Sequence, residues 1–439
     1  MAFPTGWSRR VPVVVQSSLV AATESNFPVL LTEANLPSEM FDADGADPAQ
    51  ADGGDIRIST DSNGENLLPI EVVLFSTDNN PALGKAEIWV PVNVSTSADT
   101  TIYVWYSGPG GQVQPDKLAV GGSGDAWERN FFGVFHWSSS VDVVDSTKAG
   151  LDNTFSRFPS VGNSWTLADG KIGKCMSHPN TSTNHHLRAS FGNFFKAWDK
   201  FAFEVWVNPL AVAANDTVLG LDFSNGIRFE TNGNLSLRVG GTFFGTAAIT
   251  TGSWFHVVFV FDLVAGTVTP YINGSVATSE SGVTILYGLT ALPFAIGSVS
   301  DTSANRTFRG LIDEFRMHGG TVRSANYWLT SYRAQNSPAT FAVVGSPATP
   351  TFTADVELTG LVSGSEVRAY VGTPSSSTLL DSTESSGTSF TFTHSESGNA
   401  GFIVVRKLDK KYMKIDLTYA ATDVSIPVSQ QDDAVYANP

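Results

Sequence analysis

The sequence predicts an all-β protein with three β-sandwich domains in series. Apolar residues make up 42% of the 439 positions, including 29 Phe and 10 Trp, and these side chains favour packed sheets. Charged residues make up only 15%, while 40 Gly residues provide turns. Short apolar-polar alternations recur between turn-rich segments, and the length suits roughly three domains of ~100–200 residues each.

Residues 1–124 form the first predicted sandwich. Regularly spaced strand candidates are separated by turns rich in Gly, Asn, Asp and Pro, which is typical of this architecture. The pattern contains no convincing helix. The strand candidates are Val11–Val15, Phe27–Thr32, Asp55–Ile58, Pro69–Leu74, Ala86–Val92 and Thr101–Tyr106.

This first region carries a recognisable motif order. A Trp-x-x-Arg start is followed by Phe-Pro-Val-Leu, Gly-x-Asp-Ile-Arg, Leu-Pro-x-Glu, Trp-Val-x-Val and Tyr-x-x-Tyr. In this chain the motifs are Trp7 with Arg10, Phe27–Leu30, Gly53–Arg57, Leu68–Glu71, Trp89–Val92, and Tyr103 with Tyr106. The region resembles the family called domain of unknown function 2341. That family commonly precedes a concanavalin-like module in bacterial surface and phage proteins, and it implies no known chemistry.

Residues 125–340 form the second predicted domain, centred on the apolar run Trp254–Asp262. Both alternating faces of this strand are apolar, so one should meet a sandwich core. The other should lie under a second layer, a neighbouring domain or another subunit. Tyr271–Gly274 predicts a strand that ends in an Asn-Gly type I′ turn. Arg323–Gln335 predicts a short helix that packs Trp328, Leu329 and Tyr332 inward.

The second domain resembles the laminin-G / concanavalin A-like jelly roll. The resemblance rests on a Trp-x-His-Val strand, a Tyr-x-Asn-Gly hairpin and a Gly-x-Ile-Asp-Glu-Phe-Arg strand, in that order. Here they are Trp254–Val257, Tyr271–Gly274 and Gly310–Arg316. This fold hosts lectins, hydrolases and structural modules, so the resemblance alone does not decide between them.

Residues 341–439 form the third predicted domain, an immunoglobulin-like or small jelly-roll sandwich. Five alternating strand candidates support it. Segments Gly360–Arg368 and Ser425–Pro439 resemble carboxy-terminal units of tailed-phage virion proteins. The strand candidates are Phe352–Leu358, Glu366–Val371, Ser389–Thr393, Phe402–Arg406 and Tyr412–Leu417.

The net charge of −16 argues against binding to nucleic acids or to anionic membranes. The single cysteine, Cys175, excludes an intrachain disulfide. The first residues lack the apolar core of a signal peptide, and no run of ~18 apolar residues predicts a membrane helix. We therefore expect either synthesis in a cytoplasm or a chain shown without its leader, and no insertion into membranes.

The sequence does not predict an enzyme. Hydrolases of this fold carry Glu-x-Asp-x-(x)-Glu along one strand face, and the chain lacks that motif. Asp313 and Glu314 are adjacent, so in a regular strand their side chains should point to opposite faces. Glu204 stands alone among apolar residues.

Candidate binding residues come from loop-like sequence and from the resemblance. Trp165, Trp198 and Tyr287 are candidate platforms for stacking on sugars. The laminin-G resemblance implies one Ca²⁺ at the sandwich rim, with Asp145, Asp222 and Asp313 as candidate ligands. A zinc site is the alternative, although a buried, apolar role of the cysteine competes with it. Its candidate ligands are Cys175, His178, His185 and His186.

Together these patterns predict a structural virion protein on the exterior of a tailed bacteriophage, as a tail-associated, fibre or capsid-decorating component. Its lectin-like domain would adhere to a host-surface glycan or protein. Its other partners would be virion proteins and copies of itself. The alternative is a bacterial cell-surface adhesin or carbohydrate-binding protein. Either hypothesis requires binding contacts and no reaction.

Overall fold

The computed structural model describes most of the chain. The described residues are 3–4, 6–127, 130–148, 154–158, 165–178, 185–189, 198–220, 225–239, 242–283, 294–299, 306–321, 323–350, 354–395, 399–407, 410–419 and 423–431. They are almost entirely β, as the sequence predicts, and they divide into two compact units. Residues 6–348 form the larger unit, and the chain from residue 349 onward belongs to the other.

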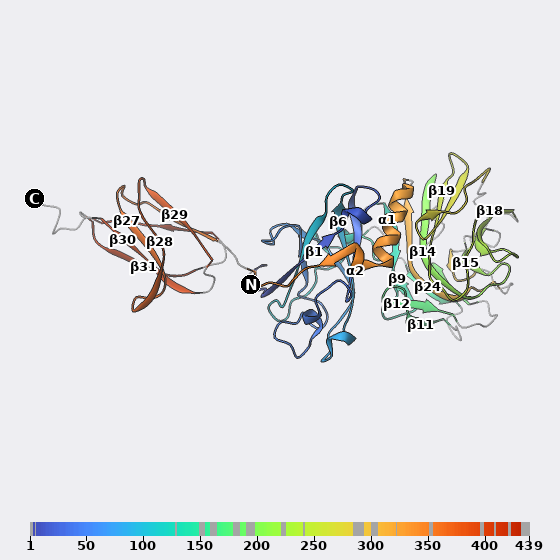
Figure 1. Ribbon diagram of the computed structural model, residues 1–439, viewed down its shortest axis with the longest axis horizontal. Helices are drawn as coiled ribbons and strands as arrows, with labels where there is room; N and C mark the ends of the chain where they lie inside the picture. Colours follow the sequence, from blue (N-terminus) through green and yellow to red (C-terminus); the bar gives the residue numbers. More distant parts are fainter. Residues whose placement is uncertain are drawn as a thin grey trace, which may run out of the picture. The chain divides into compact units, whose positions relative to one another are not determined.

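The amino-terminal part of the larger unit is a sandwich of two sheets (Figure 1). The five-stranded sheet has the order β25-β1-β7-β3-β4, with bounds Ala342–Val344, Arg9–Val15, Thr100–Tyr106, Arg57–Ser59 and Leu67–Leu68. The three-stranded sheet has the order β2-β6-β5, with bounds Glu24–Thr32, Lys85–Val94 and Glu71–Ser76. Only short 3-10 turns interrupt them, at Ser17–Leu19, Ser38–Phe41 and Pro81–Leu83.

The second part of the larger unit is a sandwich of an eight-stranded and a nine-stranded sheet. The eight-stranded sheet runs β18-β17-β16-β15-β23-β13-β10-β9: Thr242–Ala247, Leu235–Val239, Gly226–Phe229, Thr217–Gly220, Ala295–Ile296, His186–Ala189, Thr154–Phe158 and Val143–Val144. Seven strands of the nine-stranded sheet have the order β11-β12-β24-β14-β19-β20-β21. Their bounds are Thr166–Asp169, Lys174–Ser177, Arg309–Gly319, Lys200–Ala211, Phe255–Asp262, Thr267–Ile272 and Ser275–Val276. Strands β22 (Glu280–Ser281) and β8 (Phe131–Phe135) pair with β20 and β24.

Strand β19 confirms the expected two-sided burial. Phe259 and Phe261 belong to the Phe-rich core between the two large sheets. Val258 and Val260 point the other way, into a core shared with the amino-terminal sandwich. The predicted hairpin is also present, because Asn273 and Gly274 have φ values of 51° and 77°, as a type I′ turn requires.

The helix α1 (Ala325–Asn336) lies between the two sandwiches (Figure 1). Ser324 caps it by accepting a hydrogen bond from the Tyr327 backbone N–H. Its inward face buries Tyr327 and Trp328 in the shared core, while Tyr332 is half-buried. The short helix α2 (Pro338–Phe341) follows and leads into β25.

The sequence predicts divisions after residues 124 and 340, but the structure divides the chain between residues 348 and 349. The physical reason is the shared core. Strand β25 pairs with β1, so the chain returns to the first sandwich after the second is complete. Apolar side chains of both sandwiches and of α1 then form one buried cluster. The two sandwiches are therefore one compact body.

The carboxy-terminal unit is a small sandwich with its own core (Figure 1). One sheet has the order β29-β26-β32, with bounds Ser389–His394, Ala354–Thr359 and Val424–Pro427. The other has the order β28-β27-β30-β31, with bounds Ser376–Glu384, Glu366–Thr373, Ala400–Arg406 and Met413–Thr418. Strand β32 pairs with β26 in parallel, unlike its neighbours.

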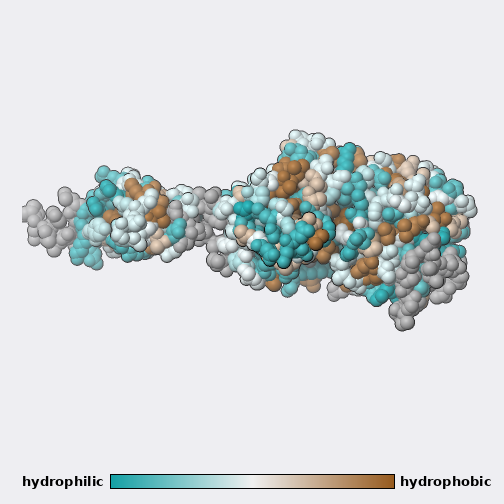
Figure 2. Space-filling view, turned by 60° about the horizontal axis from the view of Figure 1, so that its bottom comes forward, coloured by the Kyte–Doolittle hydropathy of each residue, from teal (hydrophilic) through white to brown (hydrophobic). Residues whose placement is uncertain are grey.

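The described part of the chain contains no helix long and apolar enough to cross a bilayer. On the face drawn in Figure 2, apolar residues form several patches that are separated by polar ones. Scattered surface apolar residues of this kind are normal for folded proteins.

Candidate functional site

A group of charged residues, all buried except the half-buried Glu71, lies where the two sandwiches of the larger unit meet. We call it the His136 cluster and define it as Glu71, Glu87, His136, Glu314 and Arg316. Glu71 opens β5, Glu87 lies in β6, and His136 directly follows β8. Glu314 and Arg316 lie in β24. Four elements, from three distant parts of the sequence, therefore meet at one point.

A β-bulge in β24 aims Glu314 into this cluster. Opposite β14, Arg316 pairs with Glu204 and Asp313 pairs with Trp206, so the register shifts between them. Glu314 has a φ of 50°, which is uncommon for a residue with a side chain. The extra residue interrupts the alternation, as bulges do, and re-aims a side chain.

The bulge overturns the expectation that Asp313 and Glu314 point to opposite faces. Ile312 and Phe315 both belong to the Phe-rich core, so the two residues between them lie on the other side of the sheet. Asp313 accepts a hydrogen bond from the Ile172 backbone N–H at 2.9 Å. Burial and the nearby Glu314 carboxylate raise the pKa of Asp313 well above its ordinary value.

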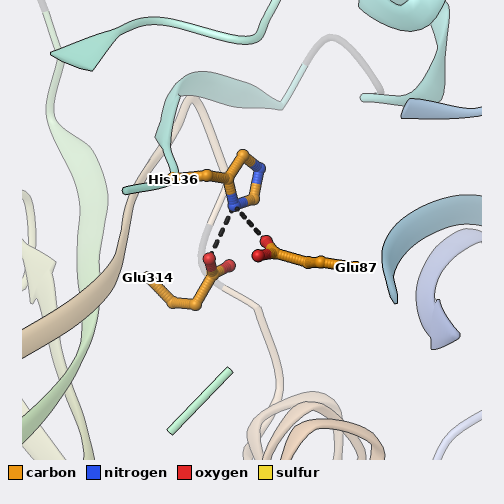
Figure 3. Close-up of side chains that lie close together, drawn as sticks. All are labelled: Glu87, His136 and Glu314. Carbon is orange, nitrogen blue, oxygen red and sulfur yellow. Dashed lines mark hydrogen bonds and ion pairs between the residues drawn. The ribbon is translucent and has the colours of Figure 1, made fainter. Parts of the chain in front are cut away.

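Two carboxylates, those of Glu87 and Glu314, approach one side of the His136 ring (Figure 3). Its Nδ1 lies 2.6 Å from Glu314 Oε1 and 3.2 Å from Glu87 Oε1, so two carboxylates approach one ring nitrogen. Its Nε2 lies 3.5 Å from Glu71 Oε2 and makes no hydrogen bond within the described residues. The side chains of His136, Glu87 and Glu314 are at most 3% exposed.

Further groups hold the carboxylates in place. Arg316 Nη2 lies 2.7 Å from Glu314 Oε2, and its guanidinium lies 4.1 Å from the centre of the Trp89 ring. The indole N–H of Trp89 donates to Glu87 at 3.1 Å, and that of Trp127 donates to Glu71 at 2.5 Å. Each carboxylate of the cluster therefore has at least one firm partner.

Burial and mutual contact shift the acid–base properties of the cluster. Burial raises the pKa of Glu87 to about 7, and the Glu314 carboxylate adds to this effect. Burial alone would lower the pKa of His136, but the carboxylates of Glu314 and Glu71 raise it well above its ordinary value. Burial would raise the pKa of Glu314, but His136 and Arg316 lower it.

A pocket of about 320 Å³ opens onto the cluster. Glu71, His136, Asp142 and several serines are among the residues that line it. The Glu71 side chain is 13% exposed and that of Asp142 is 37% exposed. The complete lining is Glu71–Val73, His136, Ser138–Ser140, Asp142–Val144 and Ser146.

A second buried network lies on the same sheet around Glu204 of β14. The carboxylate lies 2.8 Å from Nε2 of His256 and 2.8 Å from Nε2 of His318. From α1, the Ser331 hydroxyl donates to it at 2.6 Å and the Gln335 amide at 2.9 Å. Glu204 is therefore a structural hub that attaches α1 to the large sandwich.

The Glu204 network predicts acid sensitivity. Burial would raise the pKa of Glu204, but hydrogen bonds from His256 and His318 hold it well below its ordinary value of 4.5. A carboxyl whose pKa is lowered by folding stabilises the fold above its unfolded pKa. That stability is lost as the pH falls toward the folded pKa.

As the pH is lowered below about 4.5, we therefore expect the unfolding free energy of the wild type to decrease faster than that of Glu204→Gln. The difference in slope should be up to about 1.4 kcal/mol per pH unit. Urea unfolding between pH 6 and pH 3 measures this difference. Glu33→Gln, which changes a surface ion pair with Lys85, should keep the wild-type slope. Equal slopes for the wild type and Glu204→Gln would contradict the prediction.

The structure places the predicted sugar platforms differently from the sequence interpretation. Trp165 is only 2% exposed, packs in the Phe-rich core and donates to the His185 carbonyl at 3.1 Å. Trp198 is half-buried and packs edge-on against Phe132. Trp165 therefore serves packing, whereas the half-buried Trp198 stays a predicted platform. Tyr287 lies outside the described residues.

The predicted calcium ligands do not come together among the described residues. Asp145 is buried and accepts hydrogen bonds from the backbone N–H groups of Val134 and Thr147. Asp313 is held at Ile172 instead. Asp222 lies outside the described residues, and the calcium site stays a prediction.

The alternative zinc residues also have other roles. Cys175 is buried, and burial raises the pKa of its thiol far above the ordinary range. Burial lowers the pKa of His178 to about 4, and its ring packs against Trp165. Within the described ranges, the group of His, Cys, Asp and Glu close enough to share one ion consists of Glu87, His136 and Glu314.

The sequence interpretation missed Glu71, Glu87 and His136. A signal was present, because Glu87 lies inside an apolar segment and His136 lies between the apolar residues Phe135 and Trp137. Charged side chains are almost never fully buried without a partner, so such positions indicate a buried network. Which residues would meet could not be read from the sequence, since the contacts are long-range.

Comparison with known proteins identifies the larger sandwich. Residues 181–326 match the family model described as the concanavalin A-like lectin/glucanases superfamily. The chain contains a concanavalin A-like lectin/glucanase domain. The match covers the middle of the chain, and no curated protein matches the sequence significantly. From here on, the sandwich of the eight- and nine-stranded sheets is called the concanavalin A-like domain.

Solved structures give more distant similarities. Domain 4 of AbnA, a GH43 extracellular arabinanase from Geobacillus stearothermophilus, in complex with arabinotriose, is 23% identical with a TM-score of 0.37; the alignment covers 46% of this chain and 98% of that one. A Trypanosoma rangeli sialidase mutant displaying trans-sialidase activity is 13% identical with a TM-score of 0.35, covering 47% and 33%. The binding domain of Paraclostridial Mosquitocidal Protein 1 is 12% identical with a TM-score of 0.35, covering 66% and 68%.

Proposed function

We propose that this protein binds carbohydrate on a cell surface without cleaving it. We place it on the exterior of a tailed-phage virion, where it acts as an adhesion component. The observation that carries the binding function is the match of residues 181–326 to the concanavalin A-like lectin/glucanase model. That description includes both lectins and glucanases, and we propose the lectin function.

The buried carboxylates support binding over hydrolysis. A glycosidase needs two carboxyl groups about 5–9.5 Å apart that both reach the scissile bond. Glu87 and Glu314 lie close together but are each only 1% exposed, and Glu204 is equally buried. A sugar therefore cannot reach the Glu87–Glu314 pair or Glu204 in the described structure.

Adhesion would work through many weak contacts. A shallow lectin surface binds a single glycan weakly, and several copies of the protein on one particle multiply the overall affinity. The acidic chain, with a net charge of −16, would be repelled by anionic lipids and nucleic acids. The expected partners are therefore neutral surface glycans, other virion proteins and copies of this chain.

The virion location rests on the order of the regions. The DUF2341-like segment precedes the concanavalin A-like domain, and the carboxy-terminal segments resemble those of phage virion proteins. A bacterial cell-surface adhesin with the same domains is the alternative. Mass spectrometry of purified virions separates the two, because absence of the polypeptide from every preparation would contradict the virion location.

The binding function can be tested with the full chain on a glycan array. Labelled, multimerised protein should bind a related subset of glycans, and free sugar of the same kind should compete. A parallel array with chelator tests the predicted Ca²⁺. Binding to none of the glycans, or equal binding to all of them, would contradict a lectin function.

A further inference from the structure

We propose that the His136 cluster binds one divalent transition-metal ion, best matched by Zn²⁺, through His136 Nδ1 and the carboxylates of Glu87 and Glu314. The site goes beyond the proposed glycan binding, because it lies between the two sandwiches and not on a lectin surface. It also differs from the rim Ca²⁺ expected from the sequence, since it uses none of the same residues.

More hydrogen-bond acceptors lie near Nδ1 of His136 than one N–H can serve. A ring nitrogen carries at most one hydrogen, yet Glu314 Oε1 and Glu87 Oε1 lie 2.6 and 3.2 Å from Nδ1. One N–H can serve one of them well. A metal ion at the meeting point of the three atoms would serve all three at once (Figure 3).

Charge balance points the same way. The carboxylates of Glu71, Glu87 and Glu314 face a single guanidinium, that of Arg316. With all three carboxylates ionised, a protonated His136 offsets one of the two remaining negative charges, whereas a divalent cation bound to a neutral His136 would offset both. Uncompensated buried charge is costly, so a buried group of this composition favours a bound cation.

The other side of the His136 ring matches the usual surroundings of a metal-bound histidine. When Nδ1 binds a metal, the ring proton resides on Nε2 and usually points at a carboxylate or carbonyl. Here Nε2 is buried, has no hydrogen bond among the described residues and lies 3.5 Å from Glu71 Oε2. Trp127 fixes Glu71, and Trp89 and Arg316 fix the two ligand carboxylates.

The ligand types select the ion. Ca²⁺ takes six to eight oxygen ligands in most proteins, whereas imidazole together with carboxylates suits Zn²⁺ and similar ions. The pocket of about 320 Å³ that is lined by Glu71 and His136 provides the access route. A bound ion would join β6, the end of β8 and β24, and so lock the two sandwiches together.

The test uses the full chain with Zn²⁺, Mn²⁺ and Ca²⁺ as separate probes. We expect about one zinc per chain by elemental analysis after dialysis, and a higher Tm with Zn²⁺ than with chelator. Co²⁺ in place of Zn²⁺ should give a visible absorption spectrum, which reports binding without reference to stability. Any effect of Ca²⁺ on the Tm should be the same in the wild type and in Glu87→Gln, because the predicted rim site uses other residues.

Three variants distinguish a bound metal ion from a metal-free network in which His136 and the carboxylates are held by hydrogen bonds alone. Glu87→Gln keeps the shape and the neutral charge of a protonated Glu87, so it should fold but bind zinc more than ~100-fold more weakly. Glu71→Gln should weaken zinc binding by about 10- to 100-fold, as loss of a supporting partner does. Glu33→Gln, on the surface, should bind zinc like the wild type.

Two results would overturn the proposal. The first is a wild-type chain that takes up none of the transition metals and whose Tm does not respond to chelator. The second is zinc uptake that is equal in the wild type and Glu87→Gln. Either result would show that hydrogen bonds and ion pairs with the carboxylates hold His136 without a metal ion. Neither result would affect the proposed glycan binding.

Discussion

Replacing Glu204 with Leu is expected to lower the unfolding free energy of the larger unit by about 3–5 kcal/mol, because it leaves buried donors without their acceptor. Glu204 accepts from Ser331 and Gln335 of α1 and lies 2.8 Å from both His256 and His318. The apolar replacement restores none of these contacts. Urea unfolding followed by tryptophan fluorescence measures the loss.

The matched control for this substitution lies on the same strand. Lys200 opens β14 and forms a partly exposed ion pair with Asp262 at 3.0 Å. Exposed pairs contribute little, so Lys200→Ala should change the unfolding free energy by at most ~1 kcal/mol. A loss below ~1 kcal/mol for Glu204→Leu would show that the buried network does not hold α1 to the sheet.

Removing the Trp328 ring is the other substitution with a large expected effect. Trp328 is fully buried in the core shared by the two sandwiches, with its ring 5.0 Å from those of His318 and Tyr327. Trp328→Ala would leave a large cavity there, and such changes cost about 3–5 kcal/mol. We also expect faster hydrogen exchange in α1, since its main apolar anchor is lost.

Asn326→Ala provides the control on the same helix. Asn326 is exposed, so its substitution should change stability by no more than ~0.5 kcal/mol. Comparable melting curves for Trp328→Ala and Asn326→Ala would contradict the account of a shared core. A loss confined to Trp328→Ala would show that α1 joins the two sandwiches.

Local patterns predicted most of the fold. The apolar run of β19, the Asn273-Gly274 turn and the helix after Arg323 all appear as expected, because each depends on neighbouring residues. The joining of the first two sandwiches depends on distant contacts. The pairing of Val13 with Val344 could not be inferred, since a three-residue strand carries almost no pattern of its own.

The candidate site shows where local reasoning stops. The alternation rule put Asp313 and Glu314 on opposite faces, but a bulge placed both on the side that meets the amino-terminal sandwich. A single extra residue in one strand leaves no mark in the sequence. Glu87 and His136, by contrast, stand out in the sequence as polar residues among apolar ones, although their pairing does not.

The pocket beside the cluster provides the strongest alternative to binding without cleavage. Glu71 and Asp142 both line it, and two carboxyl groups at a sugar-sized pocket are what a glycosidase requires. Glu71 is held by Trp127 and faces His136, which favours a supporting role. Glu71→Gln therefore separates the two functions, because a hydrolase would lose activity and a lectin would not lose glycan binding.

The most direct test of the account incubates the full chain with a panel of purified bacterial surface polysaccharides. Retained polysaccharide is then released and analysed for chain length and for reducing ends. We predict that at least one polysaccharide is retained and is recovered at its original length, with no increase in reducing ends. New reducing ends that appear with the wild type and disappear with Glu71→Gln would contradict the account and identify the protein as a hydrolase.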